Sequence, residues 1–235
     1  RPKGSENVTR IAVRPTELPA GKGGNPAKLY SAHISGLAPG SEYEYRLGVS
    51  KRQTAWRTFT TPTASAPFKA LVFGDSQSTD YGEWARTAQA AWQNHRDAAF
   101  FIIIGDLVDM GADTKQWDAW IDGASDLLAS VPVAPVMGNH EAYGFDWKMA
   151  LPEYYLTLFS LPQNGPPGLE DYAYSFDYGD VHFVVLNTLI KELRTWYPDL
   201  IGWQKAWLTQ DLAQTKKKWK VVLMHHGLWQ IAPDA

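Results

Sequence analysis

The sequence contains no cysteine, few charged residues and no long apolar run, and each absence excludes a class of protein. Without cysteine there is no disulfide framework and no thiolate metal site, so a metal would need oxygen or imidazole ligands. Only 20% of the 235 residues are charged and the net charge is −3, which excludes a disordered polyelectrolyte or a nucleic-acid-binding tail. The longest apolar run, residues 98–104, is far shorter than the roughly 20 residues that span a bilayer. What is present, 45% hydrophobic residues and 11 Trp, is typical of a folded globular protein.

Two segments of opposite charge meet near Pro62. Residues 1–62 carry ten basic and four acidic residues, whereas residues 63–235 carry 12 basic and 21 acidic residues. Of the 11 Trp only Trp56 precedes this boundary, and the Pro-, Ser- and Thr-rich stretch at 60–67 is typical of a linker. We therefore predict two domains, at residues 1–62 and 68–235.

Short alternating runs separated by Gly/Pro turns predict an antiparallel all-β sandwich in the first segment, with strands at residues 8–13, 29–34, 43–49 and 54–59. Residues 34–46 resemble the E–F corner of a fibronectin type III domain, where a Tyr hydroxyl is tied back to the backbone. Such a domain has about seven strands in about 100 residues. We therefore expect a fibronectin type III-like sandwich that is incomplete at its start.

Buried strands alternate with helices in the second segment, which predicts an α/β sandwich. Strand-like apolar runs occur at residues 70–73, 99–104, 133–137, 181–186 and 219–224. Three helical stripes, which we expect to be core, lie between them: Trp84, Ala88 and Trp92, in a helix that begins near Thr79; Trp117, Trp120, Ile121, Ala124 and Leu128; and Trp203, Trp207 and Leu212.

Four of the predicted strands are followed at once by side chains that bind metals: Gly74-Asp75, Gly105-Asp106, Gly138-Asn139-His140 and His225-His226. Ligands of open α/β sheets bind outside the carboxyl ends of the strands, so we expect these side chains to converge at one sheet edge. Oxygen and imidazole without sulfur suit Mn, Fe or Zn. Two such ions bridged by a carboxylate lower the pKa of a shared water and clamp the oxygens of a displacement at phosphorus. The pattern predicts metal-dependent phosphoester hydrolysis.

In their order along the chain these motifs resemble those of the calcineurin-like metallophosphoesterases: Gly74-Asp75-x-Gln77, Gly105-Asp106-Leu107-Val108-Asp109, Gly138-Asn139-His140-Glu141 and residues 221–225. Residues 174–183 and the preceding fibronectin-like module are similar to the purple acid phosphatase branch. The resemblance covers nearly the whole chain. It implies a four-layer α/β/β/α sandwich with two metal ions and an activated water as nucleophile.

The resemblance also implies a role for each motif residue. Asp75 would bind the first metal, Asp106 would bridge both, and Asn139 and His225 would bind the second. Strand alternation favours His225 over its neighbour His226. His140 would lie beside the phosphoryl group and stabilise the transition state or protonate the leaving oxygen, a role that suits an imidazole.

Three features depart from the family pattern. Gln77 stands where the wider superfamily has a His, so it either binds a metal weakly or only lines the site. Asp109 stands where purple acid phosphatases have the Tyr that gives their colour, so no purple enzyme is expected; Asp109 is a ligand, a carboxylate that orients ligands, or a turn cap. The downstream Gly-His-x-His motif is missing, and we expect the printed chain to be a truncated form of a longer protein.

Three further side chains carry expectations. His182 lies inside an apolar strand and should be a hydrogen-bonded core residue. Tyr143 and Trp229 follow two of the motifs and would wall the substrate pocket.

We therefore predict a phosphoester hydrolase, and two alternatives stay open: a phosphodiesterase rather than a phosphomonoesterase, and a degenerate, non-catalytic phosphate-binding or cell-surface protein. The expected partner is a phosphoester, without a nucleic-acid polymer or a membrane span, and the oligomeric state stays open. Fibronectin-like and phosphatase pairings imply a secreted, periplasmic or cell-envelope location.

Overall fold

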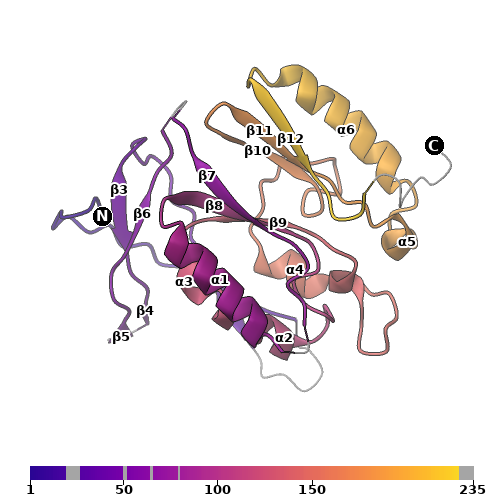
Figure 1. Cartoon of the computed structure of the whole chain (residues 1–235), viewed down its shortest axis with the longest axis horizontal. Helices are drawn as coiled ribbons and strands as arrows, with labels where there is room; N and C mark the ends of the chain where they lie inside the picture. The colour runs from indigo at the N-terminus through magenta and orange to yellow at the C-terminus, as the bar shows by residue number, and fades with distance from the viewer. Residues whose placement is uncertain (20–26, 50–51, 64–65, 79, 228–235) are drawn as a thin grey trace.

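The computed structural model of the chain describes residues 1–19, 27–49, 52–63, 66–78 and 80–227. Short antiparallel strands make up the N-terminal part, and two three-stranded sheets with helices make up the rest (Figure 1). None of the helices in the described ranges is both long and apolar enough to cross a membrane.

Three two-stranded sheets form the described N-terminal part, and all three are antiparallel: β1 (Pro15–Glu17) with β2 (Lys28–Tyr30), β3 (Glu42–Tyr45) with β6 (Arg57–Thr60), and β4 (Gly48–Val49) with β5 (Arg52–Gln53). The strand predicted at residues 8–13 is wrong. These residues have no strand partner among the described residues, and their apolar side chains are exposed. The predicted strand at 43–49 is divided between β3 and β4.

The predicted tie between a Tyr hydroxyl and the backbone is confirmed. The Ala38 N–H donates to the Tyr43 hydroxyl at 2.9 Å, and the Thr61 hydroxyl donates to the Ala38 carbonyl at 2.6 Å. The Tyr43 ring also stacks on Phe59 of β6, with 5.7 Å between the ring centroids. These contacts hold the turn before β3 against β6.

Contacts from β3 and β6 join the N-terminal part to the helical layer. The Tyr45 hydroxyl donates to the Ala129 carbonyl at 2.8 Å, just after α3 (Ser125–Leu128). Arg57 pairs with Asp126 of α3 at 3.6 Å, and Leu18 packs against the main core cluster.

A parallel sheet in the order β7-β8-β9 begins the second part, with β7 (Lys69–Phe73), β8 (Ala98–Ile104) and β9 (Val133–Val136). The helices α1 (Gly82–Asn94) and α2 (Thr114–Gly123) cover it with the predicted apolar stripes, since Trp84, Ala88, Trp92, Trp117 and Trp120 are all buried. Thr79, where the first helix was expected to begin, lies outside the described residues.

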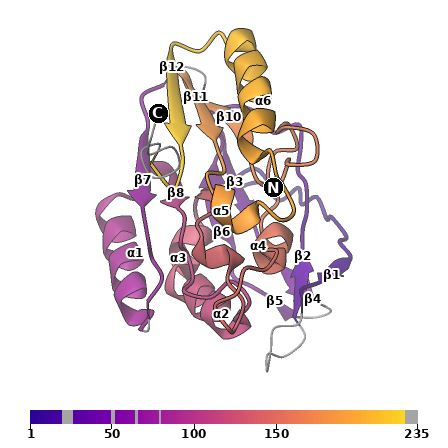
Figure 2. The same ribbon diagram turned by 90° about the vertical axis from the view of Figure 1, so that its right-hand side faces the viewer.

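The second sheet has the order β10-β11-β12, with β10 (Tyr174–Tyr178) antiparallel to β11 (Val181–Val185) and β12 (Trp219–Leu223) parallel to β11. Figures 1 and 2 show it packed against the first sheet. A shared cluster lies between the two sheets: Phe100, Ile102, Ala134, Val136, Tyr174, Phe183, Val185 and Leu223. The shorter elements are η1 (His140–Ala142), α4 (Glu153–Leu158) and α5 (Ile190–Leu193).

Helix α6 (Leu200–Gln214) lies beside the second sheet and corrects one prediction. Trp203, expected in the core, is exposed, whereas Leu200 and Gln204 are buried. The Gln204 side chain accepts from the Asn187 N–H at 2.7 Å and donates to the Asn187 carbonyl at 2.8 Å. The hydrogen bonds between Gln204 and Asn187 therefore determine which face of this helix is buried.

His182 is a hydrogen-bonded core residue, as predicted. Its Nδ1 lies 2.7 Å from a carboxylate oxygen of Asp177 in β10, and its Nε2 lies 2.7 Å from one of Asp211 in α6. Burial lowers the pKa of His182, but the hydrogen bonds and charges of the two carboxylates outweigh it and leave the pKa raised. The imidazolium therefore joins α6 to the sheet.

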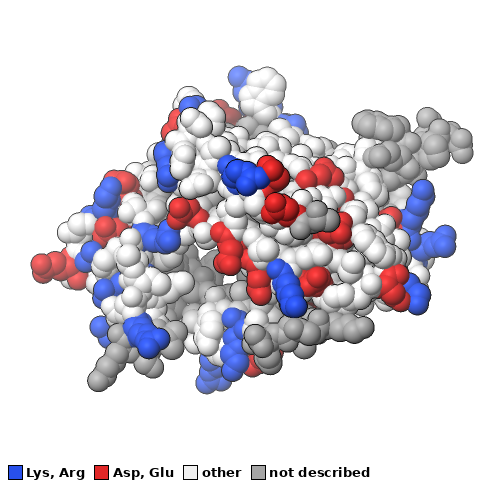
Figure 3. Space-filling view, turned by 60° about the horizontal axis from the view of Figure 1, so that its bottom comes forward, with Lys and Arg blue, Asp and Glu red and all other residues white. Residues whose placement is uncertain are grey.

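Charged side chains reflect the acidic balance of the second segment. On the face shown in Figure 3, Asp and Glu side chains gather in the middle, with Lys and Arg interspersed among them.

Candidate metal centre

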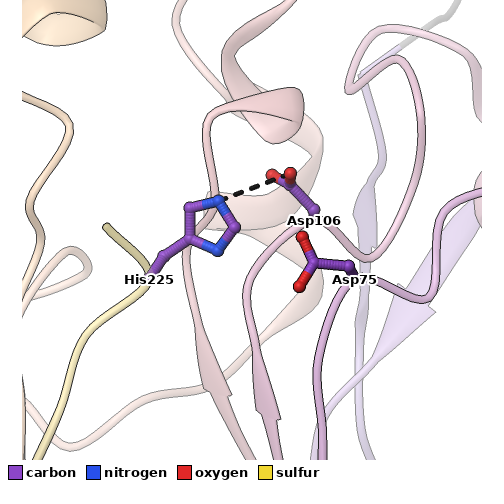
Figure 4. Close-up of side chains that lie close together, drawn as sticks. All are labelled: Asp75, Asp106 and His225. Atoms are coloured by element: carbon purple, nitrogen blue, oxygen red, sulfur yellow. Dashed lines mark ion pairs between the residues drawn. The ribbon is translucent and has the colours of Figure 1, made fainter. Parts of the chain in front are cut away.

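Side chains that follow four strands converge, but from two sheets rather than one. Asp75, Asp106 and Asn139 follow β7, β8 and β9, whose parallel strands end at the same edge. His225 follows β12 of the second sheet. Potential ligand atoms of Asp75, Asp106 and His225 all lie within 4.8 Å of one another, and Figure 4 shows the three side chains pointing toward a common centre.

The backbone reaches this geometry through tight turns. Asp75 and Asp106 adopt φ of 49° and 51°, in the left-handed region that Asp tolerates better than most residues. A Cβ at Gly138 would overlap the Asp106 backbone nitrogen and carboxylate, and one at Gly105 would overlap the His225 ring. Glycine is therefore required at both positions by close approach.

His225 directs one nitrogen into the cluster. Its Nδ1 lies 2.9 Å from the Ile104 carbonyl, while its Nε2 lies 3.0 Å from Asn139 Oδ1 and 3.4 Å from Asp106 Oδ2. Burial lowers the pKa of His225, but Asp106 and the Ile104 carbonyl outweigh it and raise the pKa to about 9. A metal ion that binds this nitrogen would have to displace its proton.

His226 also belongs to the site, which the strand-alternation argument missed. Its Nε2 lies 3.0 Å from the same Asn139 Oδ1, and its backbone N–H donates to the Thr188 hydroxyl at 3.0 Å. Burial, with the nearby charge of His225, lowers the pKa of His226. Only His225, however, joins the group of Asp75 and Asp106.

Gln77 carries an orphaned oxygen beside this group. Its Nε2 donates to Asp106 Oδ2 at 3.3 Å, whereas its Oε1 is buried without a hydrogen-bond partner in the ranges that the structure describes. A buried carbonyl oxygen without a donor carries a desolvation penalty that a cation would remove. The donor set, rich in oxygen and complemented by imidazole, therefore fits hard-to-borderline metal ions.

Asp109 contacts His140 rather than joining the cluster. His140 Nδ1 lies 2.7 Å from the Asp109 carbonyl and 3.4 Å from its carboxylate, so Nδ1–H donates to the carbonyl and Nε2 faces inward. That Nε2 is 3.8 Å from Asp106 Oδ2. Of the three roles left open for Asp109, orientation of a neighbouring side chain is the one that this geometry supports.

Glu141 is a second site residue that the motifs did not assign. Its carboxylate is 1% exposed and accepts the backbone N–H groups of Asp106 at 3.0 Å, Leu107 at 2.8 Å, Val108 at 3.3 Å and Gly138 at 2.7 Å. Burial and the charge of Asp106 raise the pKa of Glu141 to about 8, against these hydrogen bonds. One side chain thus joins the loop after β8 to the loop after β9.

Ser76 links the loops to the aromatic core. Its hydroxyl donates to the Leu107 carbonyl at 3.2 Å and accepts from Trp120 Nε1 at 2.9 Å. Trp120 stacks on Trp84, with 5.6 Å between the ring centroids. The packing of α1 and α2 therefore positions the turns that carry Asp75 and Asp106.

Tyr143 lies where the sequence placed it, beside the site. Its ring is 5.2 Å from that of His140, and its hydroxyl accepts from Asn139 Nδ2 at 3.4 Å. Trp229, the other predicted wall residue, lies outside the described residues.

Known proteins are similar to this chain in sequence and in fold. Residues 68–235 match the family model of the calcineurin-like phosphoesterases. The chain is 29% identical over 234 residues to purple acid phosphatase 23 of Arabidopsis thaliana, covering 84% of this chain and 48% of that protein. It is 30% identical over 207 residues to purple acid phosphatase 21 of the same plant, covering 86% and 44%.

A solved structure shows a similar fold. The purple acid phosphatase from yellow lupin (Lupinus luteus) seeds aligns with a TM-score of 0.62 at 19% identity, covering 90% of this chain and 46% of that chain. The chain thus spans about half the length of the proteins it matches.

Proposed function

Because the chain belongs to the calcineurin-like phosphoesterase family, we propose that it hydrolyses phosphoesters at a centre of two metal ions. The observation that carries this proposal is the convergence of Asp75, Asp106 and His225, with Asn139 in contact. Four loops from two sheets deliver these side chains to one point, and beside them the buried Gln77 Oε1 has no hydrogen-bond partner among the described residues.

We assign the ligand roles that the family resemblance implies. Asp75 and the Gln77 Oε1 would hold a first ion, Asn139 and His225 a second, and Asp106 would lie between them. Fe, Mn or Zn would suit this set. When bound, the ions would supply Lewis acidity and lower the pKa of a shared water.

His140 is the proton donor of the proposed reaction. The Asp109 carbonyl accepts a hydrogen bond from Nδ1–H, so Nε2 points toward the space beside Asp106, where the phosphoryl group would lie. From there a protonated Nε2 transfers its proton to the leaving oxygen as the phosphorus–oxygen bond breaks.

The test is hydrolysis of 4-nitrophenyl phosphate and bis(4-nitrophenyl) phosphate by chelator-treated protein, before and after addition of Mn²⁺, Fe²⁺ or Zn²⁺. We expect turnover only with metal, and the ratio of the two rates distinguishes a phosphomonoesterase from a phosphodiesterase. Turnover in excess chelator would contradict the proposal.

The domain arrangement and the location of the protein are part of the same proposal. We place the domains at residues 1–62 and 68–235, the second as a four-layer α/β/β/α sandwich and the first as a fibronectin type III-like module. The cluster between the two sheets and the Tyr43 tie support these assignments. A secreted, periplasmic or cell-envelope location follows from the same pairing of domains.

A further inference from the structure

A short loop beside His140 exposes apolar side chains. Tyr143 and Met149 pair in an isolated antiparallel bridge, and the Gly144 N–H donates to the Lys148 carbonyl at 2.9 Å. Within this loop Phe145, Trp147 and Met149 are all exposed. Three large exposed apolar residues in five positions lie next to the proposed proton donor.

Trp147 is held in a costly conformation. It has φ of 59°, in the left-handed region that is unfavourable for a bulky side chain. Its side chain is 53% exposed, so burial recovers only part of this cost. Protein folding alone gives no reason for Trp at this position.

The Trp147 ring contacts the chemistry-bearing residues. It lies 6.0 Å from the His140 ring at an interplanar angle of 90°, and 5.7 Å from the Tyr143 ring. The charges nearest to it in the loop, Asp146 and Lys148, pair with each other at 2.7 Å. Where this loop meets His140, the side chains that contact its ring are thus the aromatic rings of Tyr143 and Trp147.

We propose that Tyr143 and Trp147 form a subsite for a planar aromatic leaving group of the phosphoester. This inference rests on the proposed function, because it takes His140 as the donor to the leaving oxygen. A group attached to that oxygen would extend away from the metal cluster, along His140 toward the two rings. Stacking on such rings strengthens the binding of a planar group by about 5- to 150-fold.

Phe145 offers a matched control in the same loop. It is exposed and aromatic, and with Tyr143, Leu151 and Tyr154 it lines a cavity of about 460 Å³. Phe145 has no ring contact with His140 among those the structure shows. We therefore assign it no part in the subsite.

The experiment compares the binding of phenylphosphonate and methylphosphonate to Mn²⁺-loaded protein by calorimetry. Both ligands present the same phosphoryl oxygens, and their carbon–phosphorus bonds resist hydrolysis. We expect about tenfold tighter binding of the phenyl compound. Trp147→Asn, whose Asn tolerates the left-handed backbone, should reduce this preference to near unity. Trp147→Phe should restore part of it, and Phe145→Ala should leave it unchanged.

Each other outcome overturns the inference in a distinguishable way. If wild-type protein binds both phosphonates equally, or Trp147→Asn keeps the preference, the aromatic subsite is wrong while the phosphoester site stands. If Phe145→Ala abolishes the preference as fully as Trp147→Asn, the loop conformation rather than the Trp147 ring determines it. If neither phosphonate binds although the protein holds Mn²⁺, the proposed function itself is wrong.

Discussion

Two buried histidines lie beside carboxylates in this molecule, and their surroundings differ in one respect. Each ring nitrogen of His182 has its own carboxylate at 2.7 Å, so that cluster is closed. At His225, by contrast, a single nitrogen faces both Asn139 and Asp106, and the nearby Gln77 Oε1 has no donor in the described structure. Residue types alone would not separate the two clusters. The missing donor at the Gln77 Oε1 identifies the His225 cluster as the one that could accept a cation.

The largest effect should come from the carboxylate at the centre of the open cluster. Asp106→Ala should remove metal and activity together, and lower metal affinity by more than the roughly 100-fold that loss of an outer partner costs. Asp211→Ala, at the closed cluster, should leave metal content unchanged. Metal analysis of both variants is the measurement. If both variants lost the same amount of metal, the proposed difference between the two clusters would be wrong.

His140 separates chemistry from metal binding. His140→Ala should lower kcat by about 10² to 10⁴ and leave metal content nearly unchanged, because the side chain donates a proton without holding an ion. Substrates with a poor alkoxide leaving group should lose more than aryl substrates. Kinetics beside metal analysis tests this, and the loss of one metal equivalent would make His140 a ligand.

Glu141 tests how much the hydrogen bonds between the two loops contribute to metal binding. Glu141→Gln should weaken metal binding by about 10- to 100-fold, because its amide NH₂ would meet backbone N–H donors that now meet a carboxylate oxygen. Glu141→Asp keeps the carboxyl group on a shorter side chain and should lose less. Titration calorimetry with Mn²⁺ is the measurement. Unchanged affinity in Glu141→Gln would show that the two loops hold their geometry without this side chain.

A substitution in the closed cluster around His182 should change the stability of the protein rather than its metal binding. His182→Gln should lower the free energy of unfolding by about 2 kcal/mol at pH 6, because Asp211 loses its charged partner. The folded-state pKa of His182 is raised, so its contribution is complete below its unfolded pKa of about 6.5 and is lost as pH rises through the higher folded value. Asp177, Asp211 and Lys217 are the charged groups of this cluster.

Urea unfolding of metal-free protein at pH 6 and at alkaline pH measures this difference. The gap between wild type and His182→Gln should shrink as pH rises. A gap that is constant or that widens would mean that packing, rather than the ionic contacts, accounts for the loss.

The fold was predictable where burial decides it. Strand β8 is one uninterrupted apolar run, and the run appears in the sequence at almost the same bounds. Strand β10 alternates apolar and polar residues around Ser175 and Asp177, and we did not predict it. Residues 8–13 alternate as a strand should, yet pairing needs a partner segment, which alternation cannot supply.

The site was predictable from strand ends but not from contacts. Asp75, Asp106 and Asn139 follow apolar runs and share one edge by topology. The roles of Glu141 and Ser76 depend on backbone N–H and carbonyl groups of a distant loop, which leave no mark in residue spacing. We also did not predict a place for His226 in the site, because strand alternation assigned only one of the two adjacent rings to it.

The left-handed turns at Asp75 and Asp106 have a consequence for how the protein evolves. Among non-glycine residues, Asn shares with Asp a tolerance for φ near 50°, and Gly adopts it freely. Asp changes to either of these through a single nucleotide substitution. Such a substitution would remove the carboxylate charge and leave the backbone conformation unchanged. Glu would keep the charge but lacks this tolerance. Selection on folding would therefore do little to retain these two carboxylates, and a folded chain that lacks one of them is a single mutation away.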